Sequence, residues 1–260
     1  MFVTPNTLPD FLLSRGRHSF TLAEARDVLA SDDAAGRKGL ERLAHKGQVF
    51  SPSRSFYVVV PPEFRSWRSV PAAHFIDDLM TFLGRCYYVA LLSAAELHGA
   101  AHQAPQVFQV MVDRHLRDRD IGRVRLRFFT NAHVAGAPAE RRNVPTGQVT
   151  LSTRELTAVG LVEHPSSGGG TDNVATVLAE LGPLDGALLA AAGAHRARSV
   201  ARRLGWMLAF VAAEVDLDPL RELAAPSEGA PTDLRPGGAR RGPLDRAWNV
   251  RVNVQLDPDL

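Results

Sequence analysis

Histidines, carboxylates and glycines occur in this sequence at spacings that could serve catalysis or metal binding. His98 and His102 stand four residues apart, which would place both on one helical face within reach of one metal ion. A zinc protease of that type needs a glutamate directly after the first histidine, and Gly99 stands there instead. We therefore favour two histidines at a helix end over a metal site.

Three other features could belong to an active site. Gly168-Gly169-Gly170 precedes Thr171 and could offer backbone N–H groups to an anion, but no Lys-Ser/Thr follows as in a phosphate-binding loop. Asp113 follows an apolar run without a second carboxylate on a neighbouring strand. Ser93 lacks the context of a nucleophile elbow. We expect no catalytic residues, no cofactor and no metal.

A different chemistry is indicated near the N-terminus, where cations recur at helical spacing. A helix over about residues 33–46 would bury Ala35, Leu40, Leu43 and Ala44, and would leave a mostly basic stripe facing solvent: Arg37, Lys38, Glu41, Arg42 and His45. Side chains of this kind can bind phosphates or the hydrogen-bonding base edges of the DNA major groove. The alternative is an ordinary solvated helix face.

The elements around this helix favour the DNA interpretation. Thr21 and Glu24 can form a capping box that begins a helix before it, and Gly47 can end the basic helix. A strand at 48–50, a turn at 51–55 and a strand at 56–60 would follow as a hairpin, with Arg54 at its tip. Two helices followed by a hairpin are the layout of a winged helix-turn-helix, with Arg54 able to reach a phosphate or the minor groove.

Composition limits the possible classes. The 260 residues are 45% hydrophobic and 22% charged, which is typical of a globular protein. The net charge is only +2, so any DNA affinity must come from charges gathered on one face. Cys86 is the single cysteine, and neither a membrane span nor a signal peptide is visible. A cytoplasmic protein without membrane contact is expected.

We expect an α+β protein in which a winged helix-turn-helix domain, residues 1–65, precedes a larger mixed α/β domain, residues 72–260. The larger domain should contain a small sheet flanked by helices. Arg123, Arg125 and Arg127 alternate with apolar residues on a predicted strand at 124–130, after a turn at 118–122, so one sheet face would be basic. Ser152 is expected to cap a helix with Glu155. A closing strand at 248–254 is expected to pair with the central sheet.

The ordered series of motifs resembles the AbiEi-type antitoxins. The matching segments are FTLAEARDVL, KGLERLAHKGQVF, YYVALLSAAELHGAAHQAPQVFQV, STRELTAVGLVEHPSSGGGTDNVATVLAEL, ARRLGWML and RAWNVRVNV. The resemblance implies the antitoxin of a type IV, abortive-infection toxin–antitoxin operon. Such a protein represses its own operon at inverted repeats and counters a nucleotidyltransferase-like toxin, with DNA bound by its N-terminal domain and antitoxicity supplied by its C-terminal domain. On this resemblance, Arg37, Lys38 and Arg42 match the recognition helix and Arg54 the wing.

Three functions therefore remain to be weighed. The first is a non-enzymatic repressor and antitoxin that binds operator DNA through Arg37, Lys38, Arg42, His45 and Arg54. The second is an interaction protein whose C-terminal domain binds the toxin or its RNA substrate through Arg123, Arg125 and Arg127, without operator recognition. The third is an enzyme that modifies the toxin, which no nucleotide loop or metal cluster in the sequence supports.

Overall fold

A computed structural model describes residues 3–30, 33–100 and 106–259. The chain is a mixed α and β protein that divides into two compact units. Unit 1 comprises Met1–Tyr87, Gln106–Val134 and Arg141–Thr150, and unit 2 comprises Tyr88–Pro105, Ala135–Glu140 and Leu151–Leu260. None of the described helices combines the length and the apolar character needed to span a membrane.

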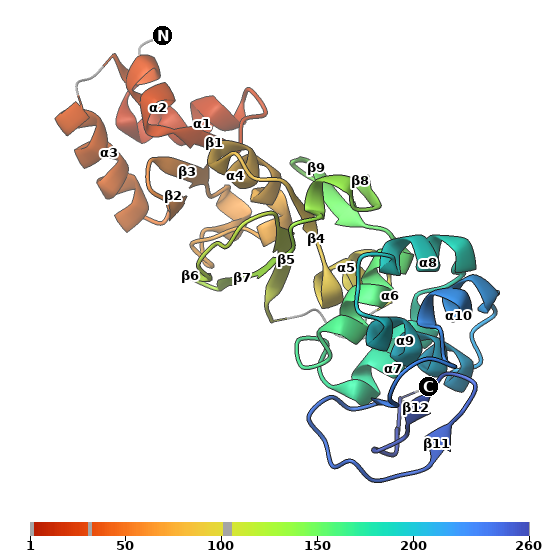
Figure 1. Cartoon of the computed structure of the whole chain (residues 1–260). Helices are drawn as coiled ribbons and strands as arrows, with labels where there is room; N and C mark the ends of the chain where they lie inside the picture. The colour runs from red at the N-terminus through yellow and green to blue at the C-terminus, as the bar shows by residue number, and fades with distance from the viewer. Residues whose placement is uncertain (1–2, 31–32, 101–105, 260) are drawn as a thin grey trace. The chain divides into compact units, whose positions relative to one another are not determined.

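Unit 1 begins with helices and a small antiparallel sheet of strand order β1-β3-β2 (Figure 1). A buried apolar core that includes Leu8, Phe20, Leu40 and Leu43 holds these elements together. The elements are the 3₁₀ turn η1 (Pro5–Thr7), α1 (Leu8–Leu13), β1 (Ser19–Thr21), α2 (Leu22–Leu29), α3 (Asp33–His45), β2 (Val49–Ser53) and β3 (Phe56–Val59).

The predicted helices and hairpin are present here, with three local differences. The capping box of α2 is confirmed: the Thr21 N–H donates to Glu24 Oε2 at 2.6 Å, and the Glu24 N–H donates to Thr21 Oγ1 at 3.2 Å. Strand β1 was not predicted. β2 runs on through Pro52, which is tolerated because β2 is an edge strand. Ala35 and Ala44 are exposed rather than inward, and the buried Gly39 lies against the Pro5 ring instead.

Helix α4 joins this N-terminal part to the rest of unit 1. The chain passes through η2 (Pro62–Phe64) and η3 (Ala72–His74) into α4 (Ile76–Leu83). Phe50 of β2 meets Phe75 with ring centroids 5.3 Å apart, and Phe56 of β3 meets Phe82 at 5.1 Å. The Ser19 hydroxyl also donates to Asp78 at 2.6 Å. The small sheet is therefore fixed to α4 by aromatic packing and a hydrogen bond.

A second, six-stranded sheet has the order β6-β7-β5-β4-β9-β8. β5 pairs with β7 in parallel, β6 with β7 antiparallel, and β4 with β9 in parallel. Residues 119–121, expected in a turn, instead form a strand that makes a hairpin with β7. The strands are β4 (Tyr87–Val89), β5 (Phe108–Val112), β6 (Arg119–Ile121), β7 (Val124–Thr130), β8 (Ala139–Val144) and β9 (Gly147–Ser152).

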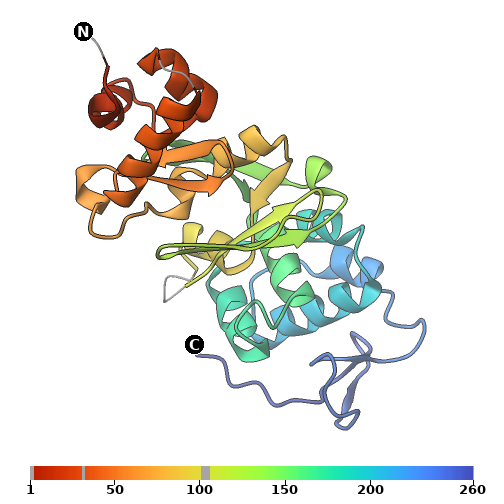
Figure 2. The same cartoon turned by 90° about the vertical axis from the view of Figure 1, so that its left-hand side faces the viewer.

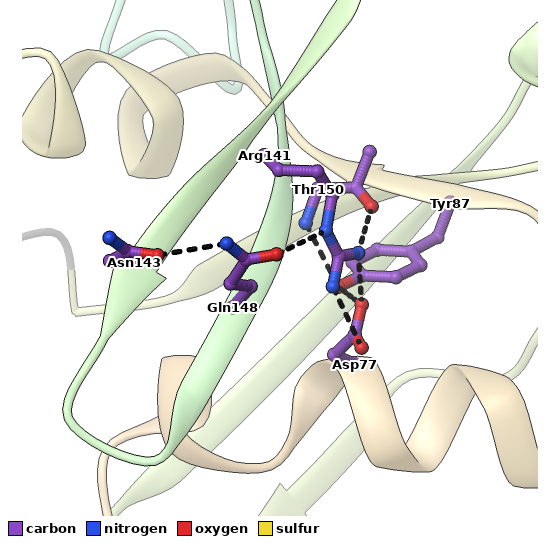
Figure 3. Close-up of polar contacts among 6 residues, drawn as sticks. All are labelled: Asp77, Tyr87, Arg141, Asn143, Gln148 and Thr150. Atoms are coloured by element: carbon purple, nitrogen blue, oxygen red, sulfur yellow. Dashed lines mark hydrogen bonds and ion pairs between the residues drawn. The ribbon is translucent and has the colours of Figure 1, made fainter.

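A polar network ties α4 to strands of this sheet within unit 1 (Figure 3). The Arg141 guanidinium donates to both carboxylate oxygens of Asp77, at 2.8 and 3.3 Å, and to the Thr150 hydroxyl at 2.9 Å. The Tyr87 hydroxyl donates to Asp77 at 2.7 Å. Burial, followed by this bond to the carboxylate, raises the pKa of Tyr87, whereas the bond to Asp77 raises the pKa of Arg141. This network keeps α4 in place against β4, β8 and β9.

Unit 2 is mainly helical, with a small sheet of order β10-β12-β11 near its C-terminal end. In Figure 2 the dark-blue terminal segment runs along the outside of the helices, where the Asp257 N–H donates to Asp172 of α7 at 2.9 Å. The short turn η4 (Val134–Gly136) lies between β7 and β8. The helices and small strands of unit 2 are α5 (Leu91–Leu97), α6 (Arg154–Glu163), α7 (Thr171–Glu180), α8 (Gly186–Gly193), α9 (Arg198–Phe210), α10 (Asp218–Ala224), β10 (Thr232–Asp233), β11 (Leu244–Asp245) and β12 (Val250–Arg251).

Two expectations about this unit were wrong. Thr153 rather than Ser152 caps α6, because the Ser152 hydroxyl is buried and bonded to the Val89 carbonyl at 3.2 Å. The closing strand is the short β12, which pairs with β10 and β11 and not with the central sheet. Trp248 anchors it by packing on Gly205 of α9, where a Cβ atom would come within 2.1 Å of the indole ring.

Candidate nucleic-acid interface

Helix α3 has one buried and one basic exposed face. Leu40 and Leu43 are each 1% exposed and point into the core of the N-terminal part of unit 1. The side chains on the other face are exposed: Arg37, Lys38, Arg42 and His45. The Arg42 Nε–H donates to the Lys38 carbonyl at 3.3 Å, a bond that does not use the terminal nitrogens of its guanidinium.

The charges on this face are not neutralised within the described part of the chain. There, none of Arg37, Lys38, Arg42 and His45 forms an ion pair. Burial raises the pKa of Tyr57 beside this helix, while Arg37 opposes and Glu41 reinforces that shift. The exposed face of α3 thus has the chemistry for binding phosphates and base edges.

The hairpin after α3 presents Arg54 at its turn. Arg54 is exposed, and Ser55 beside it has a positive φ of 64°, which closes the two-residue turn between β2 and β3. The Ser51 hydroxyl donates to the carbonyls of Ser53 and Phe56, at 2.7 and 2.9 Å, and so stabilises the turn. Arg54 is therefore carried by a short, internally bonded hairpin.

The predicted basic sheet face is largely balanced by acids. Arg127 bonds Asp120 at 2.7 Å and lies 3.5 Å from Asp118, and its hydrogen bond to Asp120 lowers the pKa of that carboxyl. Arg125 stands opposite Asp120 in the β6–β7 register. Arg123 is in the hairpin turn, with its guanidinium carbon 5.7 Å from the Trp67 ring centroid.

The sequence pattern predicts a turn at 118–122, and so it does not place Asp118 and Asp120 beside the arginines; residues 119–121 in fact form β6. The sequence RDRDIGRVRLR did contain the signal, since acids alternate with other residues before Ile121-Gly122 and arginines alternate with apolar residues after it, so that a hairpin would bring opposite charges together. The same strand supplies Arg119, which donates to the Pro52 carbonyl of β2 and ties β6 to the hairpin that carries Arg54.

The features considered for catalysis stay separate in the structure. His98 ends α5 with its Nε2 2.8 Å from the Ser152 carbonyl oxygen, and His102 lies outside the described residues. Within the described ranges, no three His, Cys, Asp or Glu side chains group as metal ligands. The Gly168 and Gly170 N–H groups donate to the backbone carbonyl of Pro165, so the glycine turn is closed on itself.

Comparison with known proteins adds a family. Residues 88–210 match the model of the AbiEi antitoxin C-terminal domain. This segment is similar to the C-terminal domain of the AbiEi antitoxins. An AbiEi domain indicates an antitoxin role in a toxin–antitoxin system, and the AbiEi family is not a known enzyme family. The matched segment contains α5 and α6 to α9, and therefore Gly205 of α9, on which Trp248 packs.

One solved structure resembles nearly the whole chain. It is the crystal structure of the RV2827C protein from Mycobacterium tuberculosis, with a TM-score of 0.68 and 14% identity over 94% of this chain and 89% of that one. At this identity the similarity concerns the fold alone. No curated protein matches the sequence.

Proposed function

We propose that this chain is a DNA-binding autorepressor and antitoxin of a type IV toxin–antitoxin operon, acting in the cytoplasm. Residues 1–65 would act as a winged helix-turn-helix domain, with α3 in the major groove and Arg54 at the neighbouring backbone. Residues 72–260 would supply the antitoxin activity against a nucleotidyltransferase-like toxin. The observation that carries the DNA-binding part is the exposed basic face of α3, whose described cations are not consumed by internal ion pairs.

Binding to the DNA upstream of the operon tests the first half. We expect Arg42→Ala to weaken binding by about 1–3 kcal/mol if Arg42 reads a base. Joint replacement of Arg37, Lys38 and Arg42 by Ala should remove most of the affinity and flatten its salt dependence, because fewer phosphates are then neutralised. Fluorescence anisotropy with labelled operator duplexes measures both.

A matched control removes the same charge elsewhere. Arg235, Arg241 and Arg246 are exposed side chains of the C-terminal segment of unit 2, and their joint replacement by Ala should leave operator affinity unchanged. Unchanged affinity after replacing Arg37, Lys38 and Arg42 would refute the assignment of α3. For the antitoxin half, failure of the full chain to restore growth of cells that express the neighbouring toxin would refute that role.

A further inference from the structure

Unit 1 has a second exposed basic surface, formed by Arg65, Trp67, Arg68 and Arg123, which we call the tryptophan–arginine platform. Trp67 is 44% exposed, although large apolar side chains are normally buried. The three arginines are exposed as well, and within the described residues none of them forms an ion pair. Arg125 is left out because Asp120 stands opposite it.

The platform is held in position by its neighbours. The Phe64 ring packs on Trp67 with centroids 5.6 Å apart and on His74 at 5.7 Å. A Cβ atom on Gly122 would lie 3.6 Å from the Trp67 carbonyl oxygen, so the β6–β7 turn rests against this segment and brings Arg123 over the indole ring. These contacts come from two distant parts of the sequence, and together they fix a basic, partly aromatic surface.

The platform also adjoins both parts of the proposed DNA-binding surface. The Arg68 side chain packs on Gly47, the residue at which the chain turns after α3, since a Cβ atom there would come within 2.9 Å of Arg68 Cγ. On the other side, β6 is tied to the hairpin of Arg54 by the bond from Arg119 to the Pro52 carbonyl. All of these residues belong to unit 1.

We propose that the tryptophan–arginine platform binds the sugar–phosphate backbone of the operator duplex, outside the groove that α3 enters. A duplex carries one negative charge per ~1.7 Å of its axis, so a helix held by α3 continues past the protein as a dense row of phosphates. Arginine forks and the indole N–H are donors suited to phosphate oxygens. This inference rests on the proposed function, and it extends the contact to flanking DNA.

A duplex fits this surface better than single-stranded RNA. Proteins that hold single strands stack successive bases on several aromatic faces. Here Trp67 is the exposed ring, one face of it is approached by Arg123, and Phe64 is inclined to it by 59°. Continuity with α3 and the hairpin of Arg54 points to the same duplex.

The test compares full-length variants on operator duplexes with short and long flanks. Replacing Arg65, Arg68 and Arg123 together by Ala should weaken binding to the long duplex at least tenfold near physiological salt. It should also reduce the slope of log affinity against log salt by about 2.7, which is about 0.9 for each of three phosphates. Binding to the short duplex should stay as in the wild type. The double variant Arg65→Glu/Arg123→Glu, which keeps the packing of Arg68 on Gly47, should weaken long-duplex binding further.

The outcomes separate this inference from the proposed function. If the α3 variant loses binding but the platform variants bind the long duplex like the wild type, the platform inference fails and the proposed function stands. If the α3 variant binds the operator normally, the proposed function fails, and the platform inference that rests on it fails as well. Loss of binding to a single-stranded RNA probe, with duplex binding intact, would also overturn the duplex assignment. The Arg235/Arg241/Arg246→Ala chain is the charge-matched control.

Discussion

Replacing Gly205 by Ala is expected to destabilise unit 2, although the change should favour helix α9. Gly205 is buried within α9, and Trp248 packs on it with 2% of its surface exposed. An added Cβ would lie 2.1, 2.3 and 2.4 Å from three carbon atoms of the indole ring. Carbon atoms pack at roughly 3.5–4.0 Å, so the helix and the ring would have to separate by more than an ångström.

The magnitude follows from two opposing contributions. Ala in place of Gly improves helix propensity by about 1 kcal/mol. Overpacking a core costs about 1–3 kcal/mol, and a rigid ring held between Gly205 and the Arg221 guanidinium, whose carbon is 4.9 Å from the ring centroid, favours the upper end. We therefore expect the Gly205→Ala chain to be about 2 kcal/mol less stable, measured as a lower urea midpoint by circular dichroism.

A second background makes this reasoning refutable. In a Trp248→Leu chain the flexible, smaller side chain leaves room for the added methyl group, so Gly205→Ala should there be neutral or stabilising by up to about 1 kcal/mol. If Gly205→Ala is as stable as the wild type when Trp248 is present, the described packing of the closing strand on α9 is incorrect.

Two further predictions concern Arg202 and Glu24. The buried Arg202 guanidinium donates to four backbone carbonyls, those of Ala224, Ala225, Glu228 and Ala230. In urea titrations, Arg202→Met should therefore lower the free energy of unfolding by about 2–3 kcal/mol, and Arg202→Lys should recover only part of that loss. Full stability of both variants would contradict this role. Burial raises the pKa of Glu24, but bonds from Thr21 and Arg17 outweigh it and hold that pKa below its ordinary value of 4.5. The ionised form of Glu24 therefore stabilises the fold above pH 4.5, and this effect is lost as the pH falls through the lowered pKa. The urea midpoints of the wild type and of Glu24→Gln should differ at pH 7 and converge at low pH. A difference that grows on acidification would contradict the assignment.

Local signals in the sequence were enough to predict the region around α3. The Thr21 and Glu24 pair begins α2, Gly47 has the positive φ of 67° that a chain leaving a helix requires, and apolar spacing identifies the buried face. Strand β1 escaped prediction because its three residues overlap the capping residue Thr21, and it is defined by its pairing with β3.

Long-range pairings could not be predicted in this way. Val89 pairs with Leu151 in parallel, and nothing in either segment names the other as its partner. The same holds for the candidate site: the exposed cations of α3 follow from helical spacing, whereas the neutralisation of Arg127 depends on a strand that was not recognised. Trp67 and Arg123 meet only through tertiary packing, so the platform could not be found from spacing.

The contacts of α4 determine where a stable fragment of this protein can be cut. Phe50 and Phe56 are 7% and 3% exposed because they rest on Phe75 and Phe82, which come after residue 65. A recombinant piece that stops at residue 65 would turn both rings toward water and would also lose the acceptor for Ser19. The part proposed to enter a DNA groove can thus be short in sequence, while the smallest fragment that keeps this packing must extend at least through α4.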